Sequence, residues 1–529
     1  MTSKTLSIFR IHICYSLWKN RHTQITNHAF TWLKTWHTLP QVLACQRFYS
    51  SDNGAGNAAM LADELQFLQT FYTSDVHGVL SIEKGCRRFC DLYRSMDTSS
   101  RLSLLCHIGE SYGVDQRAIV DVAQKVIDSQ ARGEVLMLRT LERLRRALTP
   151  RYQLLLGDIG RLEGGVKFLA DMRADILNML STTSSDLDRA HLEALQSCLR
   201  ELLSLWFTMG FLQLERATWH SSCDMLQKIS EYEVVHPVRH WADMKRRVGP
   251  YRRCYVFTHN SMPREPIVVL HCALTKDIAS SIHSILDMRG YSEKTEMDLT
   301  PPMEEVEKAE HITTAMFYSV TSTQKGLQSV DLGNYLIKRA AVELQKEWPQ
   351  ITQFSSISPI PGFRDWLTGE INRQCGALKD CSLKEEQYLI TQNEISSLCT
   401  TDSIKPEALI ALERLKDHVI NVTWTRDQDI VTVVKPILMR LCVRYLYREK
   451  RRGYALNTVA NFHLQNGAVL WRLNWAADNS PRGLSSSCGL MVNYRYFLED
   501  TVTYSQEYIE HKQIRASQQI KELCEGLHC

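Results

Sequence analysis

The spacing of apolar residues divides the chain into two parts of different texture. From about residue 52 to residue 207, apolar residues recur every three or four positions, and Pro150 is the single proline between Pro40 and Pro237. Such a period is typical of helices that bury one face against a neighbour. The pattern therefore predicts an all-helical domain over residues 52–207. The four clearest stripes are Leu61, Leu65, Leu68 and Tyr72; Val135, Leu138, Leu141, Leu144 and Leu148; Val166, Leu169, Met172, Ile176 and Leu180; and Leu192, Leu195, Leu199, Leu202 and Trp206.

After residue 208 prolines return, and the apolar runs become short and rich in β-branched residues. Residues 254–258, 267–270 and 312–320 are typical of strands, and a helix is expected from Leu336 to Leu344. Two segments read as loops: the acidic residues 290–311, and residues 375–407, which lie between a helix near Trp366 and another around residues 433–447. The pattern predicts a second, mixed α/β domain over residues 208–529.

A polar segment with two glycines, residues 324–333, lies between the last of these strands and its helix. A loop between a strand and a helix can bind an anion, because backbone amides and the positive end of the helix dipole converge there. Loops of this form also occur without ligands, so the spacing alone leaves phosphate binding open.

Composition and charge exclude two classes of partner. The 529 residues are 44% hydrophobic and 23% charged, as in ordinary globular proteins, and the net charge is +3. Removing the six basic residues of positions 1–51 leaves 56 bases against 59 acids, so no excess of positive charge is available for nucleic acid. No apolar run approaches the length that spans a bilayer.

The first 51 residues contain no acid, six basic residues and many Ser, Thr and aromatic residues. This composition predicts a mitochondrial transit peptide, with an unprocessed extension as the alternative. The 16 cysteines form no evenly spaced framework, and Cys86 and Cys90 lie one helical turn apart, as two core thiols would. We therefore expect mostly reduced, buried cysteines. The spacing patterns of zinc sites are absent, and no metal is predicted.

Three runs carry polar residues where a core element would have apolar ones. Ser358 ends a strand and is followed by Pro-Ile-Pro, His463 lies among amides before Gly467, and Tyr494 and Tyr496 share one face of a strand. A Ser, a His and a Tyr on rigid elements can form a proton-transfer site if they meet. From the residues alone, three unrelated structural side chains remain the alternative.

Seven strings of this sequence are more specific than any spacing pattern. They are Val235-His-Pro-Val238, Lys245-Arg-Arg-Val-Gly-Pro-Tyr-Arg-Arg-Cys254, Ser358-Pro-Ile-Pro-Gly-Phe363, Arg452-Gly-Tyr-Ala-Leu-Asn457, Val459-Ala-Asn-Phe-His-Leu-Gln-Asn-Gly-Ala468, Trp471-Arg-Leu-Asn-Trp475 and Asn493-Tyr-Arg-Tyr496. Together they closely resemble malonyl-CoA decarboxylases. The resemblance implies an α+β multidomain fold, in which an N-acetyltransferase-like (GNAT) α/β catalytic domain follows an all-helical oligomerisation domain. It further implies conversion of malonyl-CoA to acetyl-CoA and carbon dioxide in fatty-acid metabolism, without a cofactor.

The resemblance also assigns roles to individual residues. Catalysis falls on Ser358, His463 and Tyr496, with His463 as a proton donor that holds its proton near neutral pH. CoA binding falls on Ser358, His463 and the loop Gln328, Ser329, Val330, Asp331, Leu332, Gly333 and Asn334. Asp331, a further catalytic position, replaces the Glu expected in this family, which shortens the reach of the carboxylate by one methylene.

Assembly and location follow from the same resemblance. It implies a homo-oligomer, a tetramer built as a dimer of dimers, with an interchain disulfide at Cys223; a second family position is Asn260 and has no thiol. The mitochondrial matrix is the expected compartment, a cytoplasmic fraction is allowed, and the chain ends in His-Cys rather than the peroxisomal Ser-Lys-Leu. Two rival functions remain open: a CoA-dependent acyltransferase and a catalytically silent CoA-binding regulator.

Overall fold

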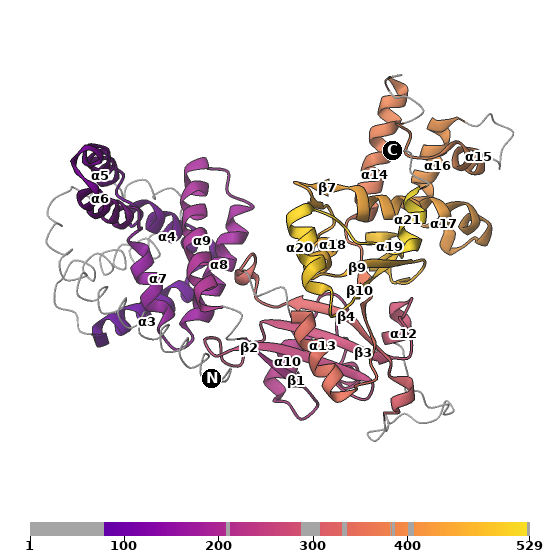
Figure 1. Cartoon of the computed structure of the whole chain (residues 1–529), viewed down its shortest axis with the longest axis horizontal. Coiled ribbons are helices and arrows are strands. Elements are labelled where there is room, and N and C mark those ends of the chain that lie inside the picture. Colours follow the sequence, from indigo (N-terminus) through magenta and orange to yellow (C-terminus); the bar gives the residue numbers. More distant parts are fainter. Residues whose placement is uncertain are drawn as a thin grey trace. The chain divides into compact units, whose positions relative to one another are not determined.

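The computed structural model describes residues 79–207, 212–286, 307–330, 336–380, 382, 387–399 and 407–525. These residues form two compact units (Figure 1). The first unit is helical and consists of the chain up to Phe207 together with the later segment Gln324–Val330. The second unit is mixed α/β and consists of Thr208–Thr323 and Asp331–Cys529. The predicted fold class, a helical N-terminal part followed by an α/β part, is confirmed. The exact domain limits at residues 51 and 207 stay predictions, and residues 1–78 lie outside the described part.

The helical unit is built from seven described helices with the periodicity that the sequence predicts. Their bounds are α3 Val79–Ser95, α4 Thr98–Ser111, α5 Gln116–Ser129, α6 Glu134–Ala147, α7 Tyr152–Gly160, α8 Gly165–Leu180 and α9 Asp186–Trp206. Side chains of Asp97, Asp115 and Ser185 cap the amino ends of α4, α5 and α9 by accepting backbone N–H groups. Most residues of the α8 and α9 stripes are buried in one core together with Cys86 and Cys90, and Leu180, Leu202 and Trp206 pack partly buried against it. The stripe at residues 61–72 lies outside the described residues.

The stripe on α6 departs from the expectation that every stripe is buried. The helix itself is present, but Val135 is 65% exposed and Leu138 is 60% exposed. The helix α5, which packs against α6, also leaves Val120 and Ile127 largely exposed. A period of 3.6 residues predicts a helix, but it does not say whether a neighbouring element covers the apolar face.

The α/β unit is organised around one sheet of eight described strands. They are β1 Leu212–Ala217, β2 Arg252–His259, β3 Val268–Thr275, β4 Thr314–Ser322, β5 Gln353–Ser356, β6 Ser358–Pro359, β9 Val469–Asn474 and β10 Met491–Tyr496. The order is β1-β2-β3-β4-β5-β10-β6, with β9 also paired to β10. Strands β4 and β5 are parallel and all other pairs are antiparallel. The predicted strands at residues 254–258, 267–270 and 312–320 are confirmed as β2, β3 and β4.

Helices cover this sheet and extend beyond it (Figure 1). They are α10 Cys223–Tyr232, α11 Trp241–Arg247, α12 Ile282–Leu286, α13 Leu336–Glu347, α14 Phe363–Lys379, α15 Gln392–Cys399, α16 Ala408–Asn421, α17 Gln428–Val443, α18 Thr458–Gln465, α19 Pro481–Ser487, α20 Thr501–His511 and α21 Gln518–Glu525. A small ribbon, β7 Lys450–Arg451 and β8 Tyr454–Ala455, follows α17. None of the described helices is long and apolar enough to cross a bilayer.

Two segments expected to be loops contain structural contacts. Residues 375–407 include α15, whose Ile395, Leu398 and Cys399 join the main core, so the prediction of a loop-rich insert is wrong there. In the acidic segment 290–311, Glu307 is not simply solvated: its carboxylate accepts two hydrogen bonds from the buried guanidinium of Arg253. A buried guanidinium needs such partners, because an unpaired charge is costly in an apolar interior.

Most cysteines are buried thiols, as the sequence predicts. Ten of the twelve described cysteines are buried, and Cys223 at the start of α10 is exposed. Burial raises the pKa of Cys86 to about 12 and the pKa of Cys90 to about 11. Thiols with such pKa values remain protonated and unreactive at neutral pH. Pairing of Cys223 with a second chain stays a prediction.

Candidate active site

The structure brings together the three side chains that the sequence singled out from distant runs. Ser358 Oγ lies 2.8 Å from His463 Nε2, and His463 Nδ1 lies 2.6 Å from the hydroxyl of Tyr496. Both distances are those of hydrogen bonds. All three residues are buried, at 5%, 4% and 3% exposure. The alternative of three unrelated polar residues is therefore excluded, because they form one hydrogen-bonded chain.

Ser358 is held where the sheet changes its pairing. Strand β5 ends at Ser356, and Ser358 begins the short β6, which pairs with Val492 of β10. Pro359 and Pro361 restrict the backbone that follows, since each proline fixes its own φ and limits the residue before it. Ser358 thus has little conformational freedom to leave the chain of hydrogen bonds.

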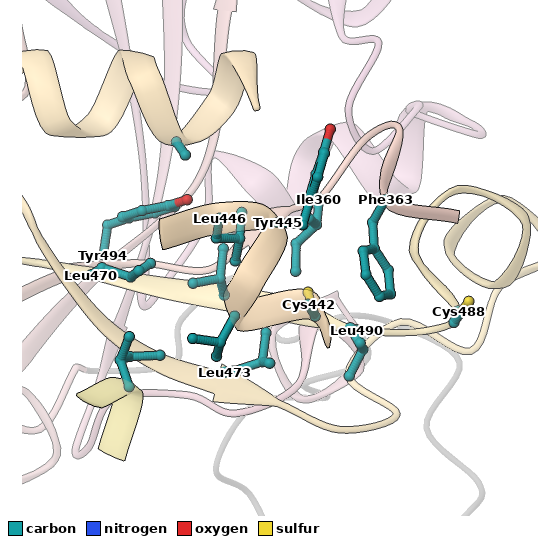
Figure 2. Packing of buried hydrophobic residues seen from close by; sticks show 14 of the residues in the cluster. Ile360, Phe363, Cys442, Tyr445, Leu446, Leu470, Leu473, Cys488, Leu490 and Tyr494 are labelled. Carbon is teal, nitrogen blue, oxygen red and sulfur yellow. The ribbon is translucent and has the colours of Figure 1, made fainter. Parts of the chain in front are cut away.

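His463 lies on α18, and a single asparagine connects this helix to the serine segment. The side chain of Asn457 caps α18 by accepting the Ala460 N–H, and it donates to the carbonyl of Pro361. The ring of Tyr494 stacks on the imidazole of His463, with centroids 4.4 Å apart. Figure 2 shows Tyr494 near Leu446 and Leu470 in the main hydrophobic core. The imidazole is therefore positioned by a capped helix on one side and a buried aromatic ring on the other.

Burial determines the protonation of this site. It lowers the pKa of His463 to about 3, because removal from water penalises the charged imidazolium. Burial also raises the pKa of Tyr496 well above its usual range near 10. Both side chains are neutral at pH 7 in the folded protein. The expectation that His463 itself holds an extra proton near neutral pH is therefore not met, and the protons available here belong to hydroxyls and a neutral imidazole.

Three polar residues at the site were not predicted as members of it. Ser356 Oγ lies 2.8 Å from Ser358 Oγ, and the Asn493 side chain donates to the backbone carbonyl of Ser356. Asn457 is the third. The sequence did contain a signal for Ser356, because residues two apart on a strand share a face. For Asn457, the signal was an asparagine directly before a helix.

The predicted anion-binding loop lies only partly within the described residues. Gln328 and Ser329 are exposed and Val330 is buried, whereas Asp331, Leu332, Gly333 and Asn334 fall outside the described part. Within the helical unit, the buried guanidinium of Arg173 on α8 donates to the carbonyls of Gly326 and Gln328. This contact fixes the start of the loop while leaving the Gln328 and Ser329 side chains accessible.

Gly326→Ala should destabilise the helical unit by about 1–3 kcal/mol. A Cβ at this position would lie 1.7 Å from the backbone oxygen of Ala170 on α8, so the loop and helix must separate. Gly157→Ala on α7 is a matched control, because nothing lies within 4 Å of its added Cβ, and alanine favours helix over glycine. Thermal unfolding followed by circular dichroism compares the two variants. An unchanged midpoint for Gly326→Ala would contradict the close packing of loop and helix.

A cavity of about 780 Å³ lies elsewhere in the α/β unit, lined by Leu214, Tyr255, Arg339 and neighbouring residues of β1, β2 and α13. None of the residues of the Ser358–His463–Tyr496 chain lines this cavity. Over the described ranges, no group of three His, Cys, Asp or Glu side chains is arranged to hold a metal ion. The hydrogen-bonded chain is therefore the stronger candidate for chemistry.

Two family models match most of the chain. Residues 112–207 match the malonyl-CoA decarboxylase N-terminal domain, and residues 210–528 match the malonyl-CoA decarboxylase C-terminal domain. The mitochondrial malonyl-CoA decarboxylase of Anser anser anser is 45% identical over 475 residues, which is 89% of each chain. That of Mus musculus is 46% identical over 444 residues, or 83% of this chain and 85% of the mouse protein.

Solved structures give the same result for the fold. The malonyl-CoA decarboxylase of Rhodopseudomonas palustris has a TM-score of 0.71 at 29% identity, and the match covers 87% of this chain and 99% of that one. The malonyl-CoA decarboxylase of Agrobacterium vitis has a TM-score of 0.67 at 28% identity, covering 85% and 96%. Sequence and backbone comparisons therefore agree over both units.

Proposed function

The chain belongs to the malonyl-CoA decarboxylase family, and we propose that it converts malonyl-CoA to acetyl-CoA and carbon dioxide at Ser358, His463 and Tyr496. The observation that carries this assignment is the continuous hydrogen-bonded chain from Ser358 through His463 to Tyr496. The family relationship indicates malonyl-CoA as the substrate, and the hydrogen-bonded side chains can donate protons within a buried site.

The reaction needs two kinds of assistance. Loss of carbon dioxide breaks the bond between the carboxylate carbon and the α-carbon, and the electron pair moves into an enolate conjugated with the thioester. The enolate oxygen needs hydrogen-bond donors, and the α-carbon needs a proton. Each preorganised donor contributes about 10²–10³ in rate, and a positioned proton donor about 10²–10⁴.

When the substrate is bound, neutral side chains can supply both the hydrogen-bond donors for the enolate oxygen and the proton for the α-carbon. Ser358 and Tyr496 carry hydroxyl protons, and His463 joins the two hydroxyls through its two ring nitrogens. The malonyl carboxylate brings a negative charge to this buried site, and a nearby negative charge raises the pKa of an imidazole. His463 therefore takes up a proton from solvent more readily with substrate present. It passes this proton to the α-carbon as the enolate forms, which returns the imidazole to its neutral form.

The pairing of β4 supports a CoA site beside these residues. Strand β4 runs to Ser322, but its parallel pairing with β5 covers only Thr314 to Phe317. The backbone of the remaining β4 residues therefore has no strand partner on the β5 side among the described residues. An extended chain containing amides, such as pantetheine, can hydrogen bond to such an edge. The loop with exposed Gln328 and Ser329, which belongs to the helical unit, is the predicted position for the pyrophosphate.

Product analysis with malonyl-CoA tests the proposal against its two rivals. Acetyl-CoA and carbon dioxide in equal amounts are expected, with no dependence on an added amine. An acylated amine would identify an acyltransferase, and CoA binding without any product would identify a silent regulator. Either result would overturn the proposal.

The first 51 residues support mitochondrial import, and the related proteins of goose and mouse are named mitochondrial. Residues 1–49 fused to a fluorescent reporter should therefore direct it to mitochondria, while a chain that starts at Ser50 should stay soluble and active. The unfused reporter is the control. Cytosolic fluorescence of the fusion would contradict the targeting role. Assembly into a dimer of dimers stays a prediction.

A further inference from the structure

A fourth hydroxyl extends the chain of hydrogen bonds away from the substrate side. Ser356 Oγ lies 2.8 Å from Ser358 Oγ, and it accepts a hydrogen bond from the backbone N–H of Tyr494 at 3.4 Å. Ser356 is 2% exposed and is the last residue of β5, next to β10. The Tyr494 amide lies where the pairing of β10 with β9 shifts register, between Asn493 and Tyr494. Such irregularities in strands often redirect groups next to active sites.

A backbone N–H can only donate, so the Tyr494 amide occupies one of the two acceptor sites of Ser356 Oγ and leaves its proton and the other acceptor site for Ser358. Ser356 Oγ is the acceptor there, and its own proton has one partner among the described residues, Ser358 Oγ. In the forward direction Ser356 donates to Ser358, and Ser358 donates to His463 Nε2. A neutral imidazole that accepts at Nε2 carries its proton on Nδ1 and donates it to the oxygen of Tyr496.

The reversed chain makes the same number of hydrogen bonds but differs in which proton lacks a partner. Reversal leaves the proton of the buried Ser356 hydroxyl without an acceptor among the described residues, and an unsatisfied buried donor is costly with or without substrate. In the forward chain the unpaired proton belongs to the hydroxyl of Tyr496. A substrate oxygen can accept that proton, so substrate binding favours the forward direction.

We propose that Ser356 is a positioning residue, which fixes the Nδ1–H tautomer of His463 and so leaves the Tyr496 hydroxyl proton free to meet the substrate. The inference rests on the proposed function for the identity of the substrate, but the tautomer itself is a property of the folded protein. Ser356 acts through Ser358 and His463 and does not touch the reacting atoms.

Nitrogen NMR of the full chain, with histidines labelled with ¹⁵N, measures the tautomer directly, because protonated and unprotonated ring nitrogens differ strongly in chemical shift. The signals of His463 are those missing from His463→Asn. The parent chain should show Nδ1 protonated and Nε2 unprotonated. In Ser356→Ala, the proton that reversal leaves unpaired belongs to Ser358, on the substrate side of the hydrogen-bonded chain, and no longer to the more deeply placed Ser356. The penalty against the reversed chain therefore falls, and His463 should shift toward the Nε2–H form. Ser355→Ala is the matched control, because this buried neighbour donates only to the backbone carbonyls of Ser356 and Tyr494. In this variant, His463 should have the same tautomer as in the parent chain.

Kinetics provide a second measurement. Ser356→Ala should lower kcat about tenfold with KM nearly unchanged, as the loss of one hydrogen bond in the transition state predicts, while Ser355→Ala keeps the parental kcat. An Nε2–H tautomer in the parent chain, or an unchanged tautomer in Ser356→Ala, would overturn the inference. Absence of decarboxylation by the parent chain would refute the proposed function instead, because the tautomer is measured without turnover.

Discussion

His463→Asn should bind CoA as the parent chain does and decarboxylate malonyl-CoA about 10²–10⁴ times more slowly. Asparagine keeps a polar group near the ring position, but it cannot accept a proton and pass it between Ser358 and Tyr496. Binding should persist, because most of the expected CoA contacts belong to the loop that includes Gln328 and Ser329, which the substitution leaves unchanged. Calorimetry with CoA and an assay of acetyl-CoA formation measure the two effects separately.

His271→Asn is the matched control for this substitution. His271 is also fully buried in the sheet, but its neighbours Leu270 and Cys272 belong to the main core, so its side chain points to the other face. There it stacks on Tyr318. The decarboxylase activity of His271→Asn should stay within a few-fold of that of the parent chain. Parental turnover by a folded His463→Asn would show that His463 is structural and would remove the proposed mechanism.

Local periodicity predicted much of the fold correctly. Strands β2 to β4, helix α13 and the shared face of Tyr494 and Tyr496 follow from short apolar runs and period-two alternation, which reflect contacts between residues close in sequence. Helix α15 was missed because its eight residues are too few to establish a helical period. The exposed face of α6 was mispredicted because burial depends on neighbours that the helix's own sequence does not specify.

The residues of the candidate site could be named from the sequence, but their contacts and their protonation could not. Ser358 and His463 are 105 positions apart, so no spacing rule places them in contact, and the resemblance to a known family was needed to join them. The charge of His463 was mispredicted for a related reason. Its low pKa results from burial by residues such as Tyr494, which stacks on the ring from another strand. Desolvation is a property of the packed protein and has no signature in the sequence around the histidine.

Mild acid should destabilise the α/β unit by about 5 kcal/mol between pH 6.5 and pH 5. Burial lowers the pKa of His236 and His271 to about 4 and the pKa of His463 to about 3. The negative charge of Glu233 partly opposes this lowering at His236 and His271. In the unfolded chain these imidazoles have a pKa near 6.5. Below that pH the unfolded state binds more protons than the folded state, so stability is complete above pH 6.5 and is lost as the pH falls toward 4.

Urea unfolding followed by tryptophan fluorescence at several pH values between 7 and 5 measures this loss. Carboxylates interfere little in that window, because those with lowered pKa, such as Asp243 and Glu347, lose their contribution only at lower pH. His463→Asn removes one of the three histidines with the strongest lowering of the pKa. It should reduce the pH dependence by about a third or somewhat less, because burial also lowers the pKa of His418. A parent chain whose stability stays constant from pH 7 to pH 5 would show that these imidazoles reach water. The proposed proton transfer also assumes that His463 is neutral before substrate binds, so that assumption would then be wrong as well.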